Sequence, residues 1–360
     1  MKETKFSTKN IVSNLFVYGV THGLVDAVCA GVVFSIFKNE IVDTSHFFVL
    51  VILYNILAFG LQIVFGLFAD YFKSPRLVAL LGCILTGISA LIFMYYPIIA
   101  VIFAGLGNAL FHVGGGSISL NLTPGKASAP GVYVAPGAFG LLIGTLLGKN
   151  GQFVAWPFII GLIVFSILMF IIKKPEMNYK RERTKIDYFK LVLLFVFLSV
   201  TIRSLVGMVL VFPWKSNITL LIILTTAVVL GKAIGGILAD KFGWIKVAVG
   251  ALVLSIPFLI FGASIPTLAI IGMFLFNITM PITLVAISNI LPGRPGFAFG
   301  ITCLALITGA FPSFFPIKQI LSGDWFIFSI ISISALSLYL GLRLLSKESV
   351  GACKNVEKII

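Results

Sequence analysis

The chain has 360 residues; 59% of them are hydrophobic, only 11% are charged, and the mean hydropathy is +1.13. A soluble domain carries about a quarter charged residues, so this composition excludes a soluble globular protein and indicates one that lies in a membrane. The formal net charge of +14 does not indicate nucleic-acid binding, because the basic residues fall in loops between apolar runs, where they control membrane topology.

Twelve apolar runs, each bounded by charge, Pro or Gly, follow one another along the chain. They cover 11–37, 45–69, 77–95, 97–121, 131–148, 153–172, 188–213, 217–239, 245–263, 266–290, 296–317 and 324–345. A transmembrane helix needs roughly 20 apolar residues, whereas open sheet edges cannot be satisfied in lipid. The sequence therefore predicts an all-α membrane protein with twelve transmembrane helices.

The distribution of Lys and Arg predicts how the helices are oriented. Of the 26 such residues, Arg203 and Lys232 lie inside spans. With the N-terminus inside, only Lys38, Lys149, Lys215 and Lys318 fall outside, and the remaining twenty face the cytoplasm. Because cytoplasmic loops carry an excess of Lys and Arg, we expect a multi-pass protein of the inner (cytoplasmic) membrane with both termini cytoplasmic.

The sequence also indicates an internal duplication. Residues 173–187 form the only strongly polar interior segment and predict a cytoplasmic linker between a six-helix bundle at 1–172 and a second at 188–360, which ends in a short cytoplasmic tail. Three features recur at nearly one offset: Gly66–Asp70 with Gly236–Asp240, Pro124–Lys126 with Pro292–Arg294, and Asn108 with Asn277. Such duplication is typical of transporters that bind substrate between their repeats.

Two predicted cytoplasmic loops read GLFADYFKSPR (66–76) and GGILADKFGWIK (235–246). They resemble the Gly-x-x-x-Asp loop signature of the major facilitator superfamily, although the first copy has Lys73-Ser74 where the signature has Gly and a base. The resemblance implies a latch that closes the cytoplasmic side, because a carboxylate favours the positive end of a helix and a basic partner. The gating residues implied are Gly66, Asp70, Arg76, Gly236, Asp240, Lys241 and Lys246.

Shorter motifs resemble the fosmidomycin-resistance-like branch of that superfamily: HGLVD (22–26), GNALFH (107–112), Arg203 and LPGRPG (291–296). The branch usually follows its helix-4 His with Pro-Glu, whereas this chain has Val113 and Gly114. The resemblance implies proton-coupled efflux of a small, possibly anionic compound, but without that buried acid.

Asp26 is the only acid inside a predicted span, and His22 lies four residues earlier on the same helix face. Because charges inside a bilayer are costly and mostly functional, Asp26 with His22 is the predicted proton-coupling site. The alternatives are a structural partner for Arg203 or a hydrogen bond within the helix. Arg203 in turn is predicted to bind an anionic substrate or to act as counter-ion to Asp26.

The remaining candidates are weaker. His112 precedes three glycines at 114–116, which predicts either a substrate contact or a helix-packing notch, and Lys232 is expected to reach the membrane interface. Gly140, Gly144 and Gly148 predict a close-packing face, and Pro136-Gly137 before them allows a bend. Further polar residues expected in the cavity are Asn55, Gln62, Asn108, Ser117, Tyr133 and Asn277.

These features predict a secondary transporter that moves a small molecule by alternating access, as a monomer, with protons as the coupling ion. We expect no enzyme activity and no cofactor: the chain has no nucleotide-binding loop. Its three His and four Cys are dispersed in the sequence, which predicts no metal site. Two alternatives stay open, a lipid or amphiphile carrier and a membrane-embedded enzyme using His22, Asp26 and His112.

Overall fold

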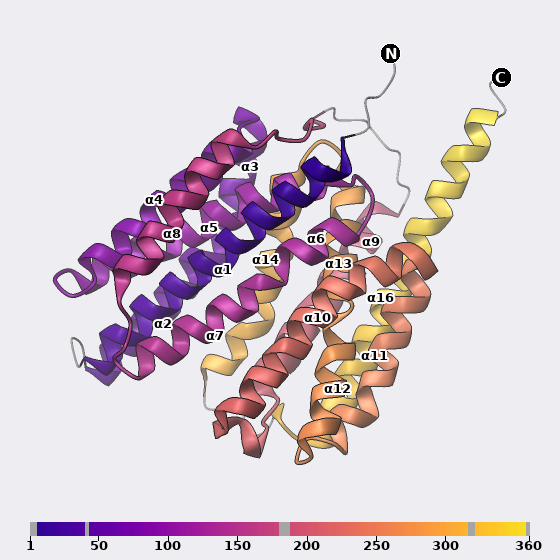
Figure 1. Cartoon of the computed structure of the whole chain (residues 1–360). Helices are drawn as coiled ribbons and strands as arrows, with labels where there is room; N and C mark the ends of the chain where they lie inside the picture. Colours follow the sequence, from indigo (N-terminus) through magenta and orange to yellow (C-terminus); the bar gives the residue numbers. More distant parts are fainter. Residues whose placement is uncertain (1–5, 40–42, 180–187, 316–320, 358–360) are drawn as a thin grey trace.

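In the computed structural model the described residues, 6–39, 43–179, 188–315 and 321–357, are mostly helical (Figure 1). Lys185 of the predicted linker and Lys318 lie outside them. The first group of helices comprises α1 (Thr8–Lys38), α2 (Thr44–Asn55), α3 (Gln62–Phe72), α4 (Pro75–Ile92), α5 (Pro97–Leu122), α6 (Ser128–Val134), α7 (Pro136–Lys149) and α8 (Ala155–Ile171). The second comprises α9 (Phe189–Val209), α10 (Ile218–Phe242), α11 (Trp244–Ile260), α12 (Pro266–Asn277), α13 (Met280–Ile290), α14 (Pro295–Ala310) and α16 (Asp324–Glu357).

Among the described residues, ten helical segments are long and apolar enough to cross a membrane, and α8 and α11 are apolar helices of 17 residues. Each of the twelve predicted apolar runs coincides with one of these segments. Three segments consist of two helices in line: α2 and α3 joined by a π-helix (Ile56–Gly60), α6 with α7, and α12 with α13. The chain is therefore a multi-pass membrane protein, as its composition predicts.

Proline explains two of the interruptions. α6 ends at Val134 and α7 begins at Pro136, which is the bend that the sequence allowed. Between α12 and α13 the helix is interrupted at 278–279, just before Pro281, and the sequence analysis did not anticipate that break. In both places a proline lacks the N–H that would continue the ladder. α16 extends to Glu357, well beyond the predicted run 324–345, so most of the expected polar tail is helical.

Figure 1 shows α1 to α8 gathered on one side and α9 to α13 with α16 on the other, while α14 lies between them; both ends of the chain lie at the same end of the molecule. We call this the terminal end. α14 lies along the boundary, where it packs against α3 and α5 as well as α9. α6 contacts α10 across the same boundary.

The predicted small-residue face of α7 is confirmed, because α7 packs backbone to backbone on α1. A Cβ added at Gly144 would lie 2.9 Å from the Cα atom of Ala27, and one at Gly148 would lie 2.8 Å from the carbonyl oxygen of Gly31. Real Cβ atoms do not approach so closely, so only glycine allows this spacing. The contact fixes how α1 is rotated, and with it the direction of the polar side chains on α1.

Candidate functional site

The structure gathers three ionisable side chains inside the first group of helices. Asp26 and His22 lie one turn apart on α1, with His22 Nε2 3.3 Å from Asp26 Oδ2. His112, on α5, places its Nε2 atom 3.5 Å from Asp26 Oδ1. Both imidazoles are buried, while 17% of the Asp26 side chain is exposed. The histidines are dispersed in the sequence, but His22 and His112 meet in space beside Asp26. The sequence inference that no potential metal-ligand cluster forms is therefore wrong.

The backbone fixes which nitrogen of each ring carries a hydrogen. His22 Nδ1 lies 2.9 Å from the carbonyl oxygen of Tyr133, and His112 Nδ1 lies 2.8 Å from that of Asn108. A carbonyl can only accept, so each Nδ1 is a donor. The break between α6 and Pro136 leaves the last carbonyls of α6 free of helix partners, which makes that of Tyr133 available. In the neutral rings, Nε2 therefore carries no hydrogen and directs its lone pair at the Asp26 carboxylate.

Asn108 completes the cluster, which we call the N-half polar cluster and define as His22, Asp26, Asn108 and His112. Its Nδ2 atom donates to Asp26 Oδ1 at 2.9 Å, while its Oδ1 atom is buried and has no hydrogen-bond partner among the described residues. Beside the cluster, a Cβ at Gly137 would lie 2.5 Å from His22 Nε2 and 2.6 Å from Asp26 Oδ2. Gly137 therefore packs directly against the converging acceptors, and a side chain there would displace them.

Glycines 114–116 lie where α5 packs closely against its neighbours. They leave no room for the Glu that follows the helix-4 His in the fosmidomycin-resistance-like branch. A Cβ at Gly114 would lie 2.5 Å from the backbone nitrogen of Ala79 on α4, and one at Gly115 would lie 2.5 Å from the hydroxyl oxygen of Tyr133. Gly116 faces the ring of Phe299. Of the two interpretations of these glycines, the structure supports the packing notch.

Arg203 lies apart from Asp26. The residue is 7% exposed, and its guanidinium donates from Nη1 to the Thr279 hydroxyl and from Nη2 to the Thr283 hydroxyl at 3.5 Å. Within the described part of the chain, no carboxylate oxygen lies within 4.0 Å of it. The expected Asp26–Arg203 ion pair is therefore not formed in this conformation. Sequence analysis missed both threonines: Thr279 lies directly before α13 and Thr283 in its first turn, and their spacing of four was the available signal.

Most of the weaker polar candidates direct their donors to their own helices. Asn55, Ser117 and Asn277 each donate to the carbonyl four residues earlier. Gln62 does the same at 2.6 Å and is fully buried, with its backbone packed against Gly300 of α14. These hydrogen bonds satisfy the side-chain donors within the helices and do not assign the residues to a binding site.

Lys232, expected at the membrane interface, is half-buried, and no ion pair forms with it among the described residues.

The two repeated Asp residues form matching contacts across the boundary. Asp70 on α3 accepts from the backbone N–H groups of Gly296 and Phe297, both at 2.9 Å, at the start of α14. Asp240 on α10 accepts from those of Ala127 and Ser128, at 2.8 and 2.9 Å, at the start of α6. Carboxylates at helix N-termini are stabilising. We call these contacts the two crossed caps.

The repeated glycines make the crossed caps possible. A Cβ at Gly66 would lie 2.6 Å from the carbonyl carbon of Gly296, and one at Gly236 would lie 2.6 Å from that of Ala127. In each half the loop motif thus places a glycine one turn before its aspartate, against the helix that the aspartate caps. The predicted pairing of the two copies is confirmed as a structural correspondence.

The basic residues of the loop motifs lie elsewhere. Arg76 donates to the carbonyls of Phe170 and Ile172 at the end of α8, and its place in the latch stays a prediction. Lys241 and Lys246 are exposed. Trp244, which sequence analysis missed, donates from Nε1 to Asp240 Oδ1 at 3.3 Å.

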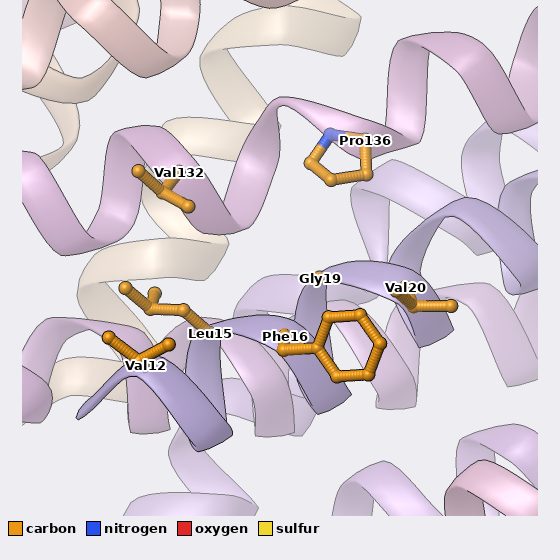
Figure 2. A pocket seen from close by; sticks show the side chains of 7 residues that line it. All are labelled: Val12, Leu15, Phe16, Gly19, Val20, Val132 and Pro136. Atoms are coloured by element: carbon orange, nitrogen blue, oxygen red, sulfur yellow. The ribbon is translucent and has the colours of Figure 1, made fainter. Parts of the chain in front are cut away.

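An apolar groove lies between α1 and the α6–α7 break (Figure 2). It is lined by Val12, Leu15, Phe16, Gly19, Val20, Val132 and Pro136. None of these side chains carries a charge or a hydrogen-bonding group. The groove therefore offers no polar group to a ligand among its lining residues.

Comparison with known proteins identifies the fold. No protein-family model matches the sequence, and no curated protein is similar enough in sequence to be a relative. Among solved structures, the human organic anion transporter MFSD10 gives a TM-score of 0.70 at 12% identity, over 93% of this chain and 100% of that one. FucP, a major facilitator transporter in its outward conformation, gives 0.64 at 12% identity, over 91% and 99%.

A third solved structure is a bacterial homologue of the iron transporter ferroportin in its outward-facing state, with a TM-score of 0.62 at 11% identity, over 95% of this chain and 99% of that one. All three cover nearly the whole of both chains. The chain has the major facilitator fold. At this level of identity the likeness concerns the fold alone.

Proposed function

We propose that the chain is a secondary transporter of the major facilitator superfamily that moves a small organic anion by alternating access. Its twelve transmembrane helices would form two six-helix halves, 1–172 and 188–360, joined by the segment 173–187. The terminal end would be cytoplasmic, in accord with the distribution of Lys and Arg. The observation that carries the substrate class is Arg203.

Arg203 is a buried cation whose described partners are neutral. A charged side chain at the centre of a membrane helix costs about 2.5–3.5 kcal/mol on insertion scales, and two threonine hydroxyls do not neutralise it. Lys232 also lies without an acidic partner among the described residues. A carboxylate or phosphonate entering between the halves would supply the missing charge, and the planar guanidinium binds such groups in a bidentate manner.

The crossed caps support alternating access. Both connect the two groups of helices at the terminal end, through backbone N–H groups that would be released when that end opens. Backbone contacts at Gly66–Gly296 and Gly236–Ala127 reinforce the closure. We propose that this conformation is closed to the cytoplasm and that rocking of the halves would break both caps together.

The N-half polar cluster is proposed as the site of the coupling cation. Two imidazole lone pairs and a carboxylate converge there, and like acceptors repel one another unless a cation lies between them. A proton held by Asp26 and His22, relayed through His112, satisfies this requirement. The direction of transport proposed from the family resemblance is efflux.

A stability screen on the purified protein tests the anion assignment. Small carboxylates, phosphonates, neutral sugars and amines are added to wild type and to Arg203→Gln, and the melting temperature is measured; ligands that bind the folded state raise it. We expect at least one anion to stabilise the wild type and to lose its effect in Arg203→Gln. Arg343→Gln, which changes an exposed arginine on α16, is the matched control and should behave as wild type.

An outcome in which only neutral or cationic compounds stabilise the protein, equally in Arg203→Gln, would overturn the anion assignment. The same screen addresses the alternatives. A membrane-embedded enzyme would return the stabilising compound chemically changed, and a lipid carrier would be stabilised by amphiphiles. No described observation favours either over a transporter of small anions.

A further inference from the structure

We propose that His22, Asp26 and His112 bind a divalent first-row transition-metal cation, held by the two Nε2 atoms and a carboxylate oxygen of Asp26. The sequence predicted no metal site, because the histidines are 90 positions apart along the chain. This inference rests on the proposed function only in that both assign a cation to the N-half polar cluster. It goes further by naming a class of ion other than the proton.

The ligand atoms are already gathered and correctly directed. One ligand atom from each residue can be chosen so that all lie within 4.8 Å of one another. Two imidazole nitrogens that share one ion at about 2.1 Å are at most about 4.2 Å apart, so the cluster would close on an ion with side-chain movements of under about 1 Å. The His22–Asp26 and His112–Asp26 distances, 3.3 and 3.5 Å, already lie inside that limit.

The hydrogen-bond partners of the three proposed ligands are those expected around a metal site. Metal-binding histidines almost always donate their other ring N–H to a carbonyl or carboxylate, which fixes the tautomer and the ring orientation. Here each Nδ1 donates to a backbone carbonyl, that of Tyr133 for His22 and that of Asn108 for His112. Asn108 in turn donates to the Asp26 carboxylate at 2.9 Å. Because each Nδ1 carries the ring hydrogen, the two Nε2 atoms of the neutral rings carry lone pairs that face Asp26.

One further observation points to an added ligand. Asn108 is 1% exposed, yet its Oδ1 atom has no hydrogen-bond partner among the described residues, and buried polar atoms are normally satisfied. A water completing the coordination sphere would donate to that oxygen. Gly137 packs directly against His22 Nε2 and Asp26 Oδ2, so any side chain there would displace the two ligand atoms.

The donor set decides the class of ion. Two imidazoles and one carboxylate suit Fe²⁺, Co²⁺, Ni²⁺ or Zn²⁺, whereas Mg²⁺ and Ca²⁺ prefer oxygen ligands. Three protein ligands leave at least one position open. With one carboxylate and two neutral imidazoles, a divalent ion gives the site a net positive charge, which would favour an anion as the remaining ligand.

The test uses the full-length protein purified in detergent and freed of metal. Equilibrium dialysis against Zn²⁺, and absorption spectra with Co²⁺, measure binding. We expect one ion per wild-type chain. Changes of outer-shell partners typically cost 10–100-fold in metal affinity, so loss of a ligand in Asp26→Asn or His112→Asn should weaken binding by about 100-fold or more. His46→Asn, which alters an exposed histidine paired with Asp43, is the matched control and should bind as wild type does.

A second measurement needs no variant that might fold poorly. X-ray absorption of the zinc-loaded wild type should show two imidazoles on the ion, and the chain has only three histidines. No stoichiometric binding, fewer than two imidazoles, or binding that survives Asp26→Asn and is lost in His46→Asn would each overturn the metal site. Those outcomes leave the anion assignment untouched, because that assignment depends on Arg203.

Discussion

Replacing the capping aspartates by asparagine should weaken closure of the terminal end. Each carboxylate of the crossed caps accepts two backbone N–H bonds, at 2.9 Å for Asp70 and at 2.8 and 2.9 Å for Asp240. An asparagine side chain has one acceptor oxygen and one NH₂ group. In Asp70→Asn or Asp240→Asn, one N–H therefore loses its acceptor, and the negative charge at the helix N-terminus disappears.

The size of the effect follows from those contacts. A hydrogen bond to a charged group contributes about 1.5–3 kcal/mol. Since 1.4 kcal/mol is a factor of ten in an equilibrium constant, each substitution should shift the ratio of open to closed terminal ends by about 10- to 150-fold. The caps lie in different parts of the boundary, so the double variant should shift the ratio by about the product of the two factors.

Distances between spin labels measure the shift. Labels at Lys73→Cys and Lys246→Cys, both exposed positions on opposite sides of the boundary, report opening of the terminal end in a background without the native cysteines. Asp43→Asn is the matched control, because Asp43 accepts from the His46 N–H at 2.8 Å at the start of α2, within one group of helices. That variant should lose the negative charge at the start of α2 without widening the label distance.

The reasoning would be refuted if Asp70→Asn, Asp240→Asn and the double variant all kept the wild-type distance distribution. The caps would then be helix caps that happen to lie at the boundary. If Asp43→Asn widened the distance as much as the cross-boundary variants do, general destabilisation would account for the change.

Three further predictions concern packing, coupling and topology. Gly66→Ala places a Cβ 2.6 Å from the carbonyl carbon of Gly296. The resulting overpacking costs about 1–3 kcal/mol and should open the terminal end in the same label assay. Gly87→Ala, whose Cβ would meet no described atom within 4 Å, should not open it. Asp26→Asn should still bind the transported anion but lose its accumulation against a gradient in proteoliposomes. One proton moved through 100 mV supplies about 2.3 kcal/mol to drive that accumulation. A wild-type flux that does not depend on pH or membrane potential would contradict proton coupling. Cysteines replacing Lys126 should react only from the cytoplasmic side and those replacing Lys149 only from outside, and labelling of both from one side would contradict the predicted topology.

Local sequence was enough to predict the helical segments and the membrane class. Each transmembrane helix satisfies its own backbone hydrogen bonds, so an apolar run of sufficient length indicates a helix whatever its neighbours are. The same local logic placed His22 and Asp26 on one face of α1, because residues four apart are neighbours on a helix. It also identified the Gly–Asp pairs of the two loops, since a duplicated motif is visible in the sequence itself.

Contacts between helices were decided only by the tertiary structure. His112 and Asn108 reach Asp26 from α5, Thr279 and Thr283 reach Arg203 from the start of α13, and Arg76 contacts the end of α8. Each of these contacts depends on how two helices are rotated and spaced relative to each other. That rotation is fixed by close backbone packing, such as Gly144 on Ala27. The sequence by itself determined which residues are charged inside the membrane, and packing between distant helices determined which of them meet.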